Sequence, residues 1–181
     1  MVLILQKFNM KPLKEATHDK HKEVERMPFN VKMFKGQLSV DEYGWYLRSQ
    51  FNIFRTIETN FELPHEGLSR VEATAFDLMS LGIDSLICDV ATRDYLEYLK
   101  ELDQDKINAH IYLNYLAIMF GGQMMKKNTP GPGKMYDFDN MMECMQSVRK
   151  IQKDEWADEV NIGFDFMIKI MKNLEGSFKI H

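Results

Sequence analysis

Two histidines near the start of the chain, His18 and His21, are the first side chains whose type and spacing could do chemistry. Their segment has helical periodicity, with an apolar stripe made by Leu13, Thr17 and Val24. On a helical wheel His21 falls on the flank of this stripe and His18 falls outside it, so we expect His21 at the edge of the interior and His18 in water. A neutral imidazole at such an edge can bind a metal or a haem iron, and it can equally be a hydrogen-bonded structural histidine.

Glu15 and His18 also have the i, i+3 spacing of a carboxylate-bridged di-iron ligand pair. Such a site requires a second pair of this kind and two further carboxylates. The other match, Glu62-Leu-Pro-His65, contains a proline that disrupts a helical i, i+3 pair. A ferritin-like di-iron site is therefore disfavoured.

Two adjacent glycines, Gly121 and Gly122, interrupt a helical segment that we predict from about Asp103 to Lys127. Glycine inside a helix costs roughly 0.5–1 kcal/mol relative to alanine, so a pair of glycines requires a reason. Without Cβ atoms the backbone lets a flat ligand approach closely, or the helix bends at this point. The alternative is a helix C-terminus with Gly121 as the capping residue. The local pattern leaves these interpretations open.

The chain of 181 residues has the size of one domain, 1–181, and can bury a core without metal or disulfide support. Its 45% hydrophobic and 28% charged residues are typical of a soluble globular protein, and no apolar run approaches the roughly 20 residues of a membrane span. The opening Val2–Leu5 is too short for a signal-peptide core, and Cys88 and Cys144 are expected to be reduced thiols without a metal role. The net charge of −4 argues against a nucleic-acid partner. We therefore expect a cytoplasmic protein without a membrane anchor.

Helical periodicity extends over nearly the whole chain, so the predicted fold class is all-α, a single bundle-like or orthogonal domain. Ser39 and Ser69 each begin a Ser-x-x-Glu capping box and predict the start of a helix. Short apolar runs at 2–5 and 86–90 could be strands but have no evident partner, and 128–134 is the clear loop. Further helices are predicted over about 13–27, 92–102, 103–127 and 154–174.

Several of these segments together resemble the haem oxygenase family. Leu13–His21 is similar to the family's proximal-helix signature, Leu-Lys-Glu-Ala-Thr followed by the axial histidine. The run His110–Leu116 and the triplet Gly121–Gln123 resemble its distal helix, in the same order along the chain. Phe34–Gln37 contains a Lys-Gly-Gln element that the family often has after the proximal helix, and the last helix around Phe164 is similar in pattern. The resemblance extends over most of the chain.

This resemblance implies an all-α fold that holds haem between the proximal helix and the glycine-bent distal helix. His21 would be the axial ligand and the metal-binding residue, through Nε2. The backbone at Gly121 and Gly122 would lie close to the porphyrin face, and Phe164 would contribute to the haem-binding site. Because a neutral histidine donates less charge than a thiolate, such a ligand does not promote early O–O cleavage.

The resemblance also assigns cations and hydroxyls to the haem propionates. Lys14 matches a propionate-contacting lysine of the family, although a solvated lysine on a basic helix face explains it equally well. Tyr112 matches a tyrosine that can reach a propionate. Of the later Lys/Arg pair that binds propionates, Lys134 is the residue retained, since Asp137 falls near the arginine.

Haem oxygenases use haem as both cofactor and substrate, which implies haem b and O2 as partners here. Electrons would come from a ferredoxin or a flavoprotein reductase, and the products would be biliverdin, carbon monoxide and ferrous iron. A lysine-rich face on the first helix could dock an acidic ferredoxin through complementary charge. That face comprises Lys7, Lys11, Lys14, Lys20 and Lys22.

The distal segment departs from the family pattern at polar positions. Ile118 stands where an aspartate commonly organises a water network, Phe54 where a tyrosine feeds it, and Met167 where the last helix has an asparagine. A neighbouring arginine position is Asn114. Proton delivery must therefore be rebuilt or absent.

Candidates for rebuilding proton delivery are Asn114, Gln123 and Tyr115, or backbone carbonyls with water. If none of them serves, the same fold would make a non-catalytic haem-binding or haem-delivery protein. A third hypothesis, a haem-oxygenase-like di-iron oxidase, requires Glu15 and His18 to converge with other carboxylates.

Overall fold

The computed structural model describes residues 10–181, and within them every regular element is helical. Lys7 and the possible strand at 2–5 lie outside the described residues. The elements are α2 (Leu13–Ala16), α3 (His18–Glu25), α4 (Pro28–Phe34), α5 (Val40–Asn60), α6 (Val71–Ser80), α7 (Val90–Lys100), α8 (Gln104–Phe120), α9 (Gly122–Asn128), α10 (Met141–Ile151) and α11 (Ala157–Phe178), with short 3-10 turns η1 (Glu66–Leu68), η2 (Lys134–Tyr136) and η3 (Asp154–Trp156). The all-α prediction is confirmed.

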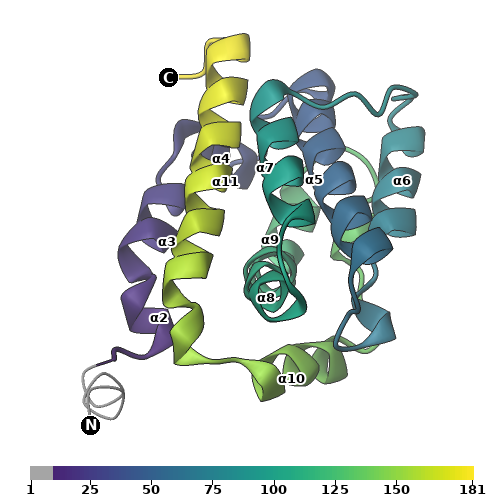
Figure 1. Ribbon diagram of the computed structural model, residues 1–181. Coiled ribbons are helices and arrows are strands. Elements are labelled where there is room, and N and C mark those ends of the chain that lie inside the picture. Colours follow the sequence, from purple (N-terminus) through teal and green to yellow (C-terminus); the bar gives the residue numbers. More distant parts are fainter. Residues whose placement is uncertain (1–9) are drawn as a thin grey trace, which may run out of the picture.

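The last helix, α11, stands between the α2–α4 segment and α7 (Figure 1). It packs against α3 and α4 on one side and against α7 and α8 on the other. Helix α5 packs against α6 and α7, and α10 crosses the end of the domain against α8. No helix in the described part of the chain is long and apolar enough to cross a membrane.

One hydrophobic core connects these helices, as expected for a single domain. Its largest fully buried side chains are aromatic, and burying one such ring stabilises the fold by about 1.5–3 kcal/mol. They are Phe29, Tyr43, Phe54, Tyr95, Tyr115 and Tyr136.

The first predicted helix is broken, which corrects the prediction of one helix over 13–27. Thr17 leaves helical geometry with φ −107° and ψ 1°, and this residue separates α2 from α3. Its hydroxyl donates to the carbonyl of Leu13 over 2.9 Å, a local bond that competes with the helical ladder. Pro28 then begins α4 directly after Met27, because its fixed φ suits the first position of a helix.

One of the two capping boxes is confirmed and the other is wrong. Ser39 Oγ accepts from the amide of Glu42 over 3.1 Å, while the Glu42 carboxylate accepts from the amide of Ser39 over 2.7 Å. Ser69 does not cap α6, since Arg70 occupies that position without a side-chain hydrogen bond. Its hydroxyl donates instead to Glu58 Oε2 over 2.6 Å.

The possible strand at 86–90 is also wrong, because these residues are irregular until Val90 begins α7. The predicted helix over 103–127 is confirmed as two helices, α8 and α9, joined at Gly121. The loop at 128–134 is present, and its Gly131 and Gly133 have left-handed φ values of 82° and 67°.

The segment from α2 to α4 is fixed to α11 and the turn before it by three bonds spaced along its length. The bonds join the amide of Leu13 to Asp154 Oδ1 over 2.8 Å, Lys20 Nζ to Asp165 Oδ1 over 2.5 Å, and the amide of Phe29 to Glu175 Oε1 over 3.0 Å. The segment that carries His21 is therefore attached through α2, through α3 and through α4.

Candidate functional site

His21 is presented by α3, and its contacts in the described structure are with Glu25 and Phe164. Its Nδ1 lies 3.5 Å from Glu25 Oε1, one helical turn later. Its ring meets Phe164 of α11 edge-on, with the ring centroids 5.9 Å apart. The side chain is 56% exposed, so His21 is more accessible than the interior edge we expected, and His18 is exposed as predicted. The Glu25 carboxylate thus lies on the Nδ1 side of the ring.

The distal helix has an exposed apolar face. Ala117, Phe120 and Met124 are exposed, the last two by 57% and 54%. These residues are three and four positions apart, a helical spacing that places them on the same side of the α8–α9 junction as Gly121. An exposed apolar stripe on a helix that is otherwise largely buried is characteristic of a binding surface.

The two glycines have different roles. A Cβ atom on Gly122 would lie 2.8 Å from Cδ1 of Tyr136, so this glycine lets α9 pack against η2. A Cβ atom on Gly121 would meet only the carbonyl of Ala117, at 3.3 Å, and the φ of Gly121 is an ordinary −85°. Gly121 therefore leaves space on the exposed face, whereas Gly122 serves internal packing.

The distal and proximal segments meet where α9 packs against α4. Asn128 Nδ2 donates to the carbonyl of Phe34 over 2.6 Å. Gly36 lies against the same asparagine, where an added Cβ atom would stand 3.2 Å from its carbonyl oxygen. The Lys-Gly-Gln element thus joins the two walls of the candidate site.

Of the three candidates for proton delivery, only Asn114 has an unpaired polar atom in the interior. Tyr115 is fully buried, donates to Glu58 Oε1 over 3.0 Å and packs on Phe54. Gln123 is exposed and donates to the carbonyl of Tyr136 over 3.3 Å. Asn114 Oδ1 is buried and no donor from residues 10–181 reaches it.

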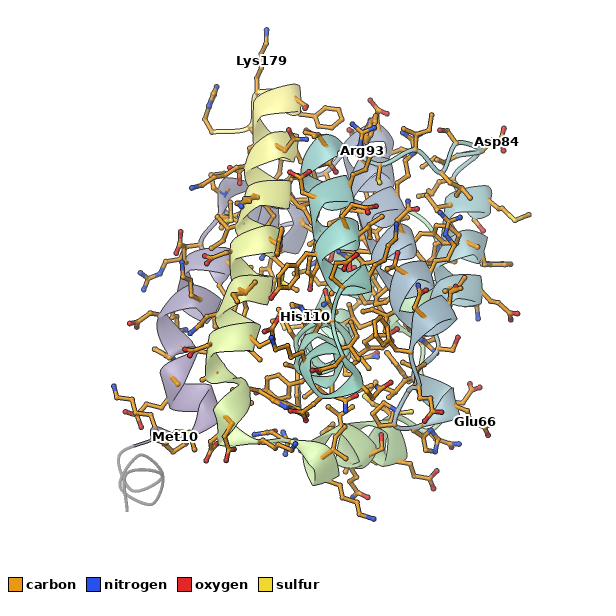
Figure 2. The ribbon with its side chains drawn as sticks, viewed as in Figure 1. Met10, Glu66, Asp84, Arg93, His110 and Lys179 are labelled. Atoms are coloured by element: carbon orange, nitrogen blue, oxygen red, sulfur yellow. The ribbon has the colours of Figure 1, made fainter. Side chains whose placement is uncertain are left out.

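Asn114 belongs to a buried hydrogen-bond chain that the sequence patterns did not predict. Its Nδ2 donates to Tyr95 Oη over 3.0 Å, and Tyr95 Oη lies 2.6 Å from His110 Nδ1. His110 Nε2 lies 2.9 Å from Glu159 Oε1, which also accepts from Tyr98 Oη over 2.5 Å. The pKa of Glu159 lies below its ordinary value of 4.5. The hydrogen bond from His110 lowers it most, and the hydrogen bond from Tyr98 lowers it by a smaller amount. Figure 2 shows His110 in the interior, beside α11.

Ile118, which stands where the resembled pattern commonly has an aspartate, is apolar and buried. Ile118 is 4% exposed and belongs to the hydrophobic core. It lies four residues after Asn114, one helical turn along α8. The Ile118 side chain has no polar atom that could bind water as an aspartate would.

The predicted propionate cations are exposed. Lys14 lies on α2 in solvent, and Lys134 Nζ is 3.7 Å from Asp137 Oδ2. Tyr112 is half-buried. Burial raises its pKa, and the positive charge of Arg149 lowers it by a smaller amount. Arg149 of α10 also lies over the Phe120 ring, 5.4 Å from its centroid. Sequence patterns missed Arg149 as a cation beside the exposed distal face, because only the packing of α10 on α8 brings it there.

The lysine-rich face of the first helices is less positive than its composition suggests. Lys11, Lys20 and Lys22 each lie within 4 Å of a carboxylate, which reduces their availability for an acidic partner. The pairs are Lys11–Glu15 at 3.6 Å, Lys20–Asp165 at 2.5 Å and Lys22–Glu25 at 3.0 Å.

The structure gives no support to a di-iron centre. Glu15 and His18 lie on separate helices and are exposed. Within residues 10–181, no three histidine, cysteine or carboxylate side chains converge on a point that could hold a metal ion.

A surface groove of about 610 Å³ lies outside the His21 site, between α3 and α11. Three cationic and three anionic side chains line it, which suits water better than a porphyrin; they are Lys22, Arg26, Lys172, Asp19, Glu23 and Glu175. We therefore locate the candidate site by His21 and the distal face rather than by the size of this groove.

The described part of the chain is thus an all-α domain with an exposed imidazole on α3 and an exposed apolar face at the glycine break between α8 and α9. The family model described as heme oxygenase matches residues 8–172. The chain belongs to the heme oxygenase family, and thereby to a class of oxidoreductase enzymes.

Known proteins agree with this assignment. The chain is 24% identical to the heme oxygenase of Guillardia theta over 203 residues, covering 92% of this chain and 86% of that protein. It is 31% identical to heme oxygenase 1 of Gallus gallus over 134 residues, covering 64% of this chain and 45% of that protein.

Solved structures show the same fold. The crystal structure of heme oxygenase-1 from the cyanobacterium Synechocystis, in complex with heme, superimposes with a TM-score of 0.79 at 20% identity, covering 91% of each chain. Heme oxygenase from Leptospira interrogans gives a TM-score of 0.77 at 23% identity, covering 89% of this chain and 97% of the other.

Proposed function

We propose that this protein binds haem through His21 Nε2 and cleaves it oxidatively to biliverdin, carbon monoxide and ferrous iron. O2 and electrons from a ferredoxin or a flavoprotein reductase complete the reaction. Bound haem supplies both the iron centre that activates O2 and the porphyrin that is cleaved. Family membership supports the reaction class, and the following residues support its location.

The observation that carries this proposal is the pairing of an accessible His21 with an exposed apolar face on α8 and α9. Glu25 lies beside Nδ1 of His21 and Phe164 contacts its ring, which leaves Nε2 as the nitrogen we propose as ligand. The space beside Gly121 admits a flat group close to the backbone, because a Cβ atom there would meet only the Ala117 carbonyl. These features fit a haem group.

The surrounding side chains would orient haem and exclude water. Phe120 and Met124 offer apolar contact to the porphyrin from the distal side. Arg149, beside Tyr112 and Phe120, would attract a negatively charged propionate, and Lys14 and Lys134 are further exposed cations for this purpose.

A hemin titration followed by absorbance tests the ligand assignment. The wild-type protein should give the Soret band of a histidine-ligated haem, and His21→Ala should weaken or abolish it until imidazole is added. His18→Ala is the matched control, since His18 is exposed three residues earlier and should leave the band unchanged. An unaltered spectrum in His21→Ala would exclude His21 as the ligand.

Adding a reductant and oxygen to the haem complex then tests the reaction, because biliverdin absorption should replace the Soret band. A non-catalytic haem-binding protein is the second candidate, and the buried, apolar Ile118 is the observation that favours it. A stable haem complex that yields no bilin would identify that function.

A further inference from the structure

Exposed apolar side chains gather in one stretch of the chain, from the second half of α6 to the start of α7. Met79 and Ile87 are the most exposed large apolar side chains within residues 10–181, by 74% and 69%. A cluster of this kind, on a domain whose other apolar residues form a core, is characteristic of an interaction surface. We call it the α6–α7 patch; its members are Phe76, Met79, Leu86, Ile87 and Val90.

The α6 part of the patch faces directly away from the core. Thr74, Asp77 and Leu78 are the buried residues of α6, whereas Phe76 and Met79 lie on the opposite side of the helix. Figure 1 shows the end of α6 and the start of α7 at the same end of the domain, joined by a segment that crosses over α5. The patch therefore covers this end of the domain.

The segment that presents Leu86 and Ile87 is fixed to α5. Asn52 Nδ2 donates to the carbonyl of Leu86 over 2.9 Å. Ile83 packs against Gly44 so closely that an added Cβ atom would overlap Ile83 Cδ1. An apolar surface that is already held in place loses little conformational entropy when another surface covers it.

Exposed charges are nearly absent from this surface. Residues 73–92 contain no lysine or arginine, and two of their three carboxylates, Asp77 and Asp89, are buried. The third, Asp84, is exposed before the apolar part of the segment, and Arg93 is exposed after it, in the first turn of α7. Within residues 10–181 neither takes part in an ion pair; the ion pair on α7 joins other residues. Figure 2 shows Asp84 and Arg93 on two margins of this end of the domain.

One acid and one base on opposite margins make the patch complementary to itself. A two-fold axis through the patch places the same surface on both sides of the contact and exchanges its margins. Asp84 of one protomer would then lie beside Arg93 of its partner, twice, while the apolar side chains meet at the centre. An anionic lipid surface would require cations among the apolar residues, and residues 73–92 provide none.

The exposed area is that of the centre of a small interface. At their exposed fractions the five apolar side chains present on the order of 500 Å² of apolar surface. A standard interface buries about 800 Å² on each partner and has a polar rim around an apolar centre. Ser80 and Ser85 are exposed beside the patch and supply part of that rim.

We propose that the α6–α7 patch is the contact between two copies of this chain, which associate about a two-fold axis into a dimer. The contact covers the five apolar side chains and pairs Asp84 of each protomer with Arg93 of the other. None of these residues belongs to the proposed haem site, so the inference does not depend on the proposed function.

Sedimentation velocity of the whole chain, from about 1 to about 200 μM, tests the association. We expect a concentration-dependent equilibrium between monomer and dimer, with its midpoint in the micromolar range. A protein that remains monomeric over this whole range would overturn the proposal.

Two substitutions in the patch test its location. Met79→Glu and Ile87→Glu should each raise the dissociation constant of the dimer by about tenfold or more, because a two-fold contact contains every substitution twice and buries the new carboxylates. Both positions are exposed in the monomer, so the melting temperature of the monomer should change little. Met142→Glu is the matched control, since Met142 is 62% exposed on α10, outside the patch, and should leave the dissociation constant unchanged. A dimer of undiminished affinity in both patch variants would place the contact elsewhere.

Exchanging the two marginal charges tests the two-fold arrangement. Asp84→Arg and Arg93→Asp should each raise the dissociation constant by about threefold to tenfold, because each breaks two exposed ion pairs and leaves like charges opposed. The double variant should regain most of the lost affinity. A double variant as weak as the single variants would contradict the pairing. A dimer that binds no haem contradicts only the proposed function, and a monomer that binds haem contradicts only this inference.

Discussion

Nε2 of His110 lies 2.9 Å from Oε1 of Glu159, and this hydrogen bond joins the middle of α8 to the first turn of α11. Both side chains are shielded, with exposed fractions of 0% and 12%. The bond therefore fixes the direction of His110 in the interior and contributes to stability as well as to the distal polar chain.

Glu159→Gln should lower the free energy of unfolding at pH 7 by about 1–3 kcal/mol, because a hydrogen bond to an ionised group is lost. The pKa of Glu159 is lowered in the folded state, so its contribution is present above the unfolded value and lost as pH falls through the folded pKa, below 4.5. The difference in free energy of unfolding between Glu159→Gln and wild type should therefore shrink as the pH falls below 4.5.

Chemical denaturation at pH 7 and at several values below 4.5 measures this effect. Asp158→Asn is the control, since Asp158 is exposed in the same helical turn and its loss should change stability by less than about 0.5 kcal/mol. A destabilisation of Glu159→Gln that does not vary with pH would contradict the assignment.

Gly163→Ala should destabilise the protein by about 1–3 kcal/mol through overpacking. A Cβ atom at this position would overlap Leu113 Cδ2 and lie 3.1 Å from His110 Nδ1, so the Leu113 side chain or the α11 backbone would have to shift. Gly176→Ala on the same helix meets nothing within 4 Å and should be neutral or stabilise by up to about 1 kcal/mol. Thermal unfolding of the two variants compares them, and equal melting temperatures would refute the close approach.

The glycine pair should separate into a packing residue and a site residue. Gly122→Ala should lower stability by about 1–3 kcal/mol, because its Cβ atom would lie 2.8 Å from Tyr136. Gly121→Ala should leave stability nearly unchanged and weaken haem binding, since the new methyl group enters the open side of α8. Thermal unfolding and hemin titration of both variants give the test, and the reverse pattern would exclude Gly121 from the haem site.

Ile118→Asp should destabilise the protein by roughly 3 kcal/mol or more and should not restore a distal water network. Ile118 is 4% exposed among core side chains, and Phe54 offers no hydroxyl to a new carboxylate. Ile118→Val, which removes one methylene, should cost only about 0.5–1.5 kcal/mol. Denaturant unfolding measures both, and faster bilin formation in a stable Ile118→Asp protein would contradict this account.

The two walls of the proposed site were inferred from local signatures in the sequence. The segment around His21 and the Gly121–Gly122 break each depend on neighbours within one or two helical turns. The helical pattern did not predict the break at Thr17, where the local bond from the Thr17 hydroxyl is accompanied by a bond from the Leu13 amide to Asp154, 141 residues away. Ser69 likewise found a partner, Glu58, on another helix.

The polar chain behind the distal face could not be predicted for a similar reason. His110 and Glu159 are 49 residues apart, and their contact exists only because α8 and α11 approach closely at Gly163. The sequence did single out Asn114 as a polar candidate on α8. Which of its atoms is unpaired depends on Tyr95, a side chain from a third helix.

The three bonds that fix α2, α3 and α4 have a consequence for the thermodynamics of ligand capture. Because Leu13, Lys20 and Phe29 attach this segment to α11 and the turn before it, we expect the His21 backbone to move little when a ligand arrives. Adjustment is then confined to rotation of the imidazole about its own side-chain bonds. Little conformational entropy remains to be lost at that position, so the proximal half of the site is preorganised and induced fit, where it occurs, belongs to the distal half.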